Sequence, residues 1–254
     1  MHPQSHDFLN DITVEHGPIE LLGRFFLKAE QAARQRGVFL SFDTFETLLE
    51  TNERNRANWR PLIPVFNPRN GGLTADNSFC ILGRNHEGDV VAAHAGRLYE
   101  WSNTTYYEEA AALRLFYADP DGMKCPGEEC KITAQATRDI SGNVVFSGAA
   151  WYRPDYRGCN LSAILPKLGK AYAFTRWNPD TIVSMMVEDV YQRGFAPRFG
   201  YNNVDWEILM RNSALGNVRM AFVWMDTQHL IGDLAQFSAQ VPAEIDSRIL
   251  KRRA

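Results

Sequence analysis

The sequence predicts an α/β protein with a mixed central sheet and helices on both of its faces. Segments with apolar residues at helical spacing alternate with short apolar runs, in the order helices, hairpin, strand, helix, strand, helix, hairpin. No repeat or composition break interrupts that order. We therefore expect one domain over residues 41–240, an N-terminal helical extension over residues 1–40 and a C-terminal tail over residues 241–254.

Composition and charge exclude several classes of protein. With 254 residues, 45% hydrophobic and 22% charged, the chain has the composition of a soluble globular protein. Its net charge of −3 gives no positive field for a nucleic acid. Its first twenty residues do not form a secretory signal, and no apolar run approaches the roughly 20 residues that span a bilayer. We expect no nucleic-acid or membrane partner.

The four cysteines are too few and too scattered for a disulfide framework, so a reducing, cytoplasmic setting is the default. Cys125 and Cys130 have the spacing of half a zinc site, but no second pair accompanies them. We expect no metal.

The first half of the chain predicts two helices and a hairpin. Apolar residues at helical spacing run from residue 18 to residue 36, and Gly37 stops that helix. A second helical pattern starts at about Asp43. Residues 77–101 predict two strands joined by a turn at residues 85–88. Residues 102–130 are less regular and are interpreted as an insertion.

The second half predicts the elements that would hold a site. A strand ends at Pro154, a helix follows over residues 160–174, and a buried strand covers residues 181–187. A short helix is expected over residues 188–198. Two final strands are then joined across a loop that contains Gly216 and Asn217.

The turn between the strand ending at Pro154 and the next helix is the most informative stretch. A turn that feeds a helix leaves the first N–H groups unpaired and directs the positive end of the helix dipole outward, which favours a pyrophosphate. Arg157 adds a positive charge, Gly158 and Ser162 keep bulky side chains away, and Asn160 tolerates a left-handed backbone. The sequence predicts an anion site here.

At this turn the sequence resembles the GNAT acetyltransferase superfamily, whose signature is Arg or Gln, two residues, Gly, one residue, then Gly or Ala. The matching run starts at Arg157, and Asn160 and Ser162 stand at the two small-residue positions. The similarity in element order extends from about residue 40 to residue 226. It implies a GNAT acyl-CoA N-acyltransferase fold, in which the cofactor lies where the fourth and fifth strands splay apart. The cofactor-binding residues implied are Trp151, Tyr152, Arg157, Gly158, Cys159, Asn160, Leu161 and Ser162.

The resemblance also directs attention to the helix after the fifth strand, where family members often carry a Tyr that protonates the departing thiolate. The matching position is Ala196, so Tyr191 is the candidate acid, with Tyr152 one strand away. Glu188 and Asp189 are candidate bases for the amine. Tyr191 would otherwise pack its ring on the core, and the two carboxylates would otherwise cap the helix.

The function implied is an N-acetyltransferase that moves an acetyl group from acetyl-CoA to an unidentified primary amine, in a small molecule or a peptide, by direct attack. One alternative is a longer-chain acyltransferase that uses acyl-CoA or an acyl carrier protein. Another is a non-catalytic acyl-CoA-binding regulatory protein. The N-terminal helix packs either on the domain or on a second subunit, so a homodimer stays among the expected assemblies.

Overall fold

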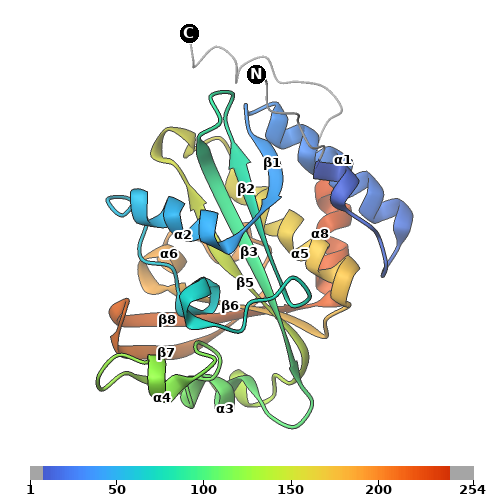
Figure 1. Cartoon of the computed structure of the whole chain (residues 1–254). Coiled ribbons are helices and arrows are strands. Elements are labelled where there is room, and N and C mark those ends of the chain that lie inside the picture. Colours follow the sequence, from blue (N-terminus) through green and yellow to red (C-terminus); the bar gives the residue numbers. More distant parts are fainter. Residues whose placement is uncertain (1–7, 241–254) are drawn as a thin grey trace.

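The central sheet has eight strands in the order β1-β2-β3-β5-β6-β8-β7-β4 (Figure 1). The computed structural model describes residues 8–240, and the expected tail lies outside them. The strands are β1 Phe39–Asp43, β2 Ser78–Arg84, β3 Val90–Trp101, β4 Glu129–Ile132, β5 Gly142–Tyr152, β6 Thr181–Val187, β7 Asn203–Ser213 and β8 Gly216–Asp226. The helices are α1 Ile19–Arg34, α2 Phe45–Arg54, α3 Tyr106–Ala111, α4 Pro120–Met123, α5 Leu165–Trp177, α6 Glu188–Gln192, α7 Phe195–Arg198 and α8 Thr227–Gln240.

The strand directions divide the sheet into two halves. Between residues 8 and 240, every pairing of neighbouring strands is antiparallel except the central one, where β5 and β6 are parallel. That central pairing joins residues 144–146 to residues 181–183. A parallel pair needs a crossover connection, and α5 supplies it. Two antiparallel halves therefore meet at one short parallel seam.

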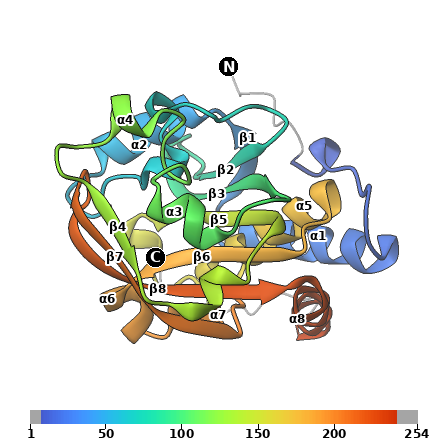
Figure 2. The same ribbon diagram turned by 90° about the horizontal axis from the view of Figure 1, so that it is seen from below.

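Helices cover both faces of the sheet, as the sequence predicts (Figure 2). The helices α1, α5 and α8 contact one another on one face, where Leu22, Leu168 and Leu234 share a buried cluster. On the other face α2 and α3 cover a second cluster, which includes Leu48 and Tyr106. The predicted α/β class, with its mixed sheet and N-terminal helix, is confirmed.

Local sequence signals explain several element boundaries. The Thr44 side chain accepts a hydrogen bond of 3.1 Å from the Thr47 backbone N–H and caps α2. Thr105 and Glu108 form a capping box at the start of α3. Gly37 has φ +70°, so the chain leaves α1 shortly before it, as the sequence predicts.

Two predicted helices have different bounds. The helix expected from residue 160 begins at Leu165, because Asn160 is left-handed with φ +60° and a 3₁₀ turn follows at Leu161–Ala163. The helix expected over residues 188–198 is split into α6 and α7, because Gly194 has φ +74°.

Strand β1 and helix α8 were not predicted, α3, α4 and the start of β4 lie in the stretch interpreted as an insertion, and one loop was misplaced. Strand β1 has only five residues, and α8 buries only a narrow stripe that includes Leu230 and Leu234, so neither gives a strong periodic signal. The loop between β7 and β8 consists of residues 214–215, and Gly216 and Asn217 already belong to β8.

Gly169 lets α5 approach β3 closely. A methyl group added there would overlap the ring of the buried His94, whereas one added at Gly23 in α1 would meet no atom within 4 Å. We expect Gly169→Ala to lower the free energy of unfolding by about 1–2 kcal/mol, because overpacking outweighs the gain in helix propensity. Gly23→Ala, as the matched control, should raise it by about 0.5–1 kcal/mol. Urea unfolding measures both, and equal stabilisation by the two changes would contradict the packing account.

Candidate active site

The seam between β5 and β6 opens into a cavity of about 470 Å³. The two strands stop pairing after residues 146 and 183, and the cavity lies between Ser147 and Tyr152 on one side and Ser184 and Val187 on the other. In β5, Ala149 has φ +53°, and the register with β3 shifts nearby. The edge of β5 that faces β6 therefore has backbone groups free for a ligand.

The cavity crosses the sheet from one face to the other. We name its two parts by the helix on the same face. The α5-side compartment is lined by Tyr152, Met186, Phe195, Phe199 and Tyr201, which pack on the cluster under α5. The α2-side compartment is lined by Trp59, Leu62, Ile63, Met185, Val187 and Leu215, which pack on the cluster under α2. Two reactants can therefore approach the gap between the strands from opposite faces.

The predicted turn lies directly after β5, and Arg157 at its start lines the cavity. Gly158 has φ +84° and open space where a side chain would stand. Within residues 8–240, no protein acceptor takes a hydrogen bond from the backbone N–H groups of Gly158, Asn160, Leu161 or Ser162. These unpaired donors fit an anion. They belong to the turn and the 3₁₀ segment rather than to the first turn of α5.

Three arginines surround this turn, and sequence reasoning found only one of them. Arg157 donates to the carbonyl oxygens of Tyr152 (3.2 Å) and Asn58 (3.1 Å). Arg198 donates to the Asn160 side-chain oxygen at 3.1 Å, and Arg36 donates to the Cys159 carbonyl oxygen at 2.6 Å. Because Arg36 and Arg198 lie far from the turn along the chain, no local motif contains them. Together they add positive charge around the unpaired N–H groups.

The two predicted aromatic residues of β5 lie on opposite faces. Trp151 is buried, stacks on Trp59 with ring centroids 4.7 Å apart and donates to the Asn58 side chain at 3.0 Å. The hydroxyl of Tyr152 is buried and has no hydrogen-bond partner among the described residues. Burial raises the pKa of Tyr152, and the charge of Arg198 opposes that shift. Tyr152 is thus a protonated donor in the α5-side compartment.

Of the predicted acid and bases, Tyr191 and Glu188 do not line the cavity. Tyr191 packs edge-on against the Trp206 ring, with centroids 5.2 Å apart. Glu188 forms an ion pair with Arg219, at 2.5 Å. Asp189 does line the cavity, where its carboxylate pairs with Arg60 at 3.1 Å. The structure therefore brings Asp189 to the cavity and leaves Glu188 and Tyr191 outside it.

A chain of buried polar groups lies where β5 and β6 separate. The Tyr201 hydroxyl is hydrogen-bonded to Ser147 and Ser184, which follow the last paired residues of the two strands. Burial raises the pKa of Tyr201 to about 12. Ser147 lies 3.1 Å from Nε2 of His94. Burial, followed by the charge of Lys170, lowers the pKa of His94 to about 3, so its ring is neutral at physiological pH. The sequence signal for this chain, which the sequence analysis missed, was the presence of Ser147 and Ser184 inside two otherwise apolar strand segments.

Lys170 is buried behind this chain. Its Nζ donates to the Phe199 carbonyl oxygen and lies 4.0 Å from the centre of the Tyr201 ring. Burial, followed by the charge of Lys167, lowers the pKa of Lys170 to about 7, while Asp233 opposes the shift. Because α5 is buried on nearly all sides, its apolar periodicity gave no indication of this lysine's position.

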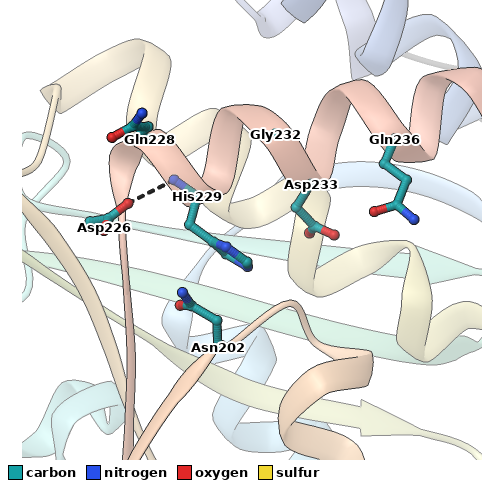
Figure 3. Close-up of a pocket in the computed structure, with 7 residues that line it drawn as sticks. All are labelled: Asn202, Asp226, Gln228, His229, Gly232, Asp233 and Gln236. Carbon is teal, nitrogen blue, oxygen red and sulfur yellow. Dashed lines mark hydrogen bonds between the residues drawn. The ribbon is translucent and has the colours of Figure 1, made fainter.

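A second cavity of about 580 Å³ lies beside α8 (Figure 3). Its lining is polar and shares no residue with the β5–β6 cavity. Asp226 accepts a hydrogen bond from the His229 backbone N–H at 2.7 Å, and Asp233 is ion-paired with Lys167. These carboxylates therefore already hold the start of α8 and join α8 to α5.

Comparisons with known proteins return structural neighbours only. No protein-family model and no curated protein matches the chain. The structure is similar to that of a spermidine/spermine N-acetyltransferase from Vibrio cholerae, with 8% identity, a TM-score of 0.45, and 77% of this chain and 97% of that chain covered. An uncharacterized protein from Bacillus halodurans has 11% identity and a TM-score of 0.47, with 81% of this chain and 93% of that chain covered. The aminoglycoside acetyltransferase AAC(6')-Ib, in complex with coenzyme A and kanamycin, has 11% identity and a TM-score of 0.43, with 76% of this chain and 96% of that chain covered.

The strand order and the opened seam define the class of fold. The protein is an α/β protein whose mixed sheet is split between two central parallel strands, with a turn of unpaired N–H groups after the first of them. This is the arrangement of strands, seam and turn that the resemblance at Arg157 implies. Between residues 8 and 240 no helix is long and apolar enough to cross a membrane.

Proposed function

We propose that this protein is an N-acyltransferase that transfers an acetyl group from acetyl-CoA to a primary amine. The observation that carries the proposal is the cavity through the sheet, which ends beside a turn rich in unpaired N–H groups and arginines. The pyrophosphate of the donor binds at that turn, where Arg157 and Arg198 add charge. The rest of the donor follows the α5-side compartment to the gap between β5 and β6.

The reaction is a direct attack. The amine enters from the α2-side compartment, and its nitrogen lone pair forms a C–N bond at the thioester carbonyl carbon. The C–S bond breaks, the sulfur leaves as the CoA thiol after it takes a proton, and the amine gives its proton to water or to a carboxylate. Free N–H groups on β5 polarise the carbonyl, and binding both reactants supplies proximity. The roles of Tyr191 as acid and of Glu188 as base stay predictions. Because neither residue lines the cavity, each would act through a water molecule.

A longer acyl chain is the second candidate, and one observation favours it. The α2-side compartment is apolar and lies beyond the point where the thioester would bind. An octanoyl group would bury apolar surface there, at about 0.8 kcal/mol for each CH₂ group.

Calorimetric titration with acetyl-CoA and with octanoyl-CoA tests the proposal. We expect micromolar binding of acetyl-CoA, weakened about tenfold to a hundredfold by Arg157→Glu, since a hydrogen bond to a charged group contributes about 1.5–3 kcal/mol. Arg24→Glu, on the exposed side of α1, is the matched charge reversal and should bind as the wild type does. Circular dichroism checks that each variant is folded. If the folded wild type binds neither thioester, the proposal is wrong.

A further inference from the structure

The α2-side compartment has an apolar floor and an open, charged mouth. Trp59 forms the floor, and its ring is nearly parallel to that of Trp151, with an interplanar angle of 6°. The side chains of Arg60 and Asp189 at the mouth are 59% and 47% exposed. A molecule can therefore enter this compartment from solvent while the donor occupies the opposite face.

The charges around the cavity do not suit a polycation. Besides Arg157, whose charge faces the donor pyrophosphate on the proposed function, Arg60 and Arg193 line it against a single aspartate, Asp189, among the described residues. The Asp189 carboxylate is already paired with Arg60. A polyamine or an aminoglycoside carries several positive charges, and each needs a carboxylate or leaves a repulsive pair. The excess of positive charge disfavours such acceptors.

The apolar lining also acts on the reacting amine itself. Burial in an apolar site disfavours the ammonium form and lowers the pKa of an amine, so the neutral nucleophile is favoured where attack takes place. A molecule with one amine and an apolar body can therefore lose its proton by entering the compartment. Such an acceptor needs no unpaired carboxylate as a base inside the cavity.

We infer that the acceptor is a small monoamine with an apolar, aromatic-sized body, and not a polyamine. The inference rests on the proposed function and names the acceptor class of the same site. The aromatic group packs on Trp59 and between Ile63 and Leu215, and the amine points toward the gap between β5 and β6.

Calorimetry at saturating CoA tests this inference, with 2-phenylethylamine, hexylamine and spermidine as probes. We expect both monoamines to bind at least about tenfold more tightly than spermidine. Leu215→Glu places a carboxylate in the apolar lining and should weaken phenylethylamine binding while strengthening spermidine binding. Val204→Glu on β7 is the matched control, because Val204 is 42% exposed and lies outside the cavity lining. It should change neither affinity.

The outcomes separate this inference from the proposed function. Spermidine binding as tight as that of the monoamines, or no amine binding by a protein that binds CoA, overturns the acceptor class and leaves the donor site standing. A tenfold preference for octanoyl-CoA over acetyl-CoA that Leu215→Glu removes would assign the compartment to an acyl chain and also overturn the inference. Failure of all thioester binding instead overturns the proposed function.

Discussion

Lys170→Met is expected to remove a pH dependence from the stability of the protein. The pKa of Lys170 is lowered to about 7 in the folded state from 10.5. Between these values the unfolded chain holds a proton that the folded protein lacks, so wild-type stability rises with pH relative to the variant. At about 1.4 kcal/mol per pH unit, the difference between the two proteins should change by about 2–3 kcal/mol from pH 7 to pH 9.

Urea unfolding of both proteins at pH 7, 8 and 9 measures this difference. The charged and titratable groups around Lys170 are Lys167, Asp233, His94 and Tyr201, and all of them remain in the variant. Lys124→Met, at an exposed lysine, is the matched control and should show no such change. A stability difference that stays constant from pH 7 to pH 9 would show that the Lys170 amine titrates as it does in water.

Leu234→Ala is expected to lower the free energy of unfolding by about 2–5 kcal/mol, because it leaves a cavity beneath α8. Leu234 is fully buried and belongs to the cluster shared by α1, α5 and α8. The expected loss is large because the leucine side chain is removed from a closely packed cluster, in which α5, the helix that follows the candidate anion turn, also packs.

Chemical denaturation measures that loss, and Gln236→Ala gives the comparison two residues further along α8. Gln236 is exposed, so its replacement should change stability by no more than about 0.5 kcal/mol. If the two variants lose equal stability, α8 does not pack on α1 and α5 in solution.

The position and backbone shape of the candidate anion turn were predictable because its residues are local. Arg157, Gly158 and Asn160 are close in sequence, and the left-handed conformation expected at Asn160 is observed, at φ +60°. The two further arginines come from the turn after α1 and from α7, and only the folded chain brings them there. A sequence pattern therefore located the turn and missed most of the charge around it.

The buried polar chain shows a different limit of prediction from sequence. Ser147 and Ser184 lie inside apolar strands, but their partner Tyr201 follows another helix, and His94 comes from β3. Which buried polar groups meet depends on strand order, which a single sequence does not specify. The short strand β1 and the helix α8 were missed for a simpler reason, since their apolar patterns are too short or too sparse.

The short seam gives the proposed substrate a structural role of its own. Residues 144–146 and 181–183 are the only stretch over which β5 and β6 pair within the described chain, and beyond it each strand lacks a neighbour on the facing edge. The amide-rich arm of a CoA thioester would supply hydrogen-bond partners to those edges in the place of a strand. On the proposed function, binding of the donor completes the hydrogen bonding in the middle of the sheet, and release of CoA leaves those edges unpaired again.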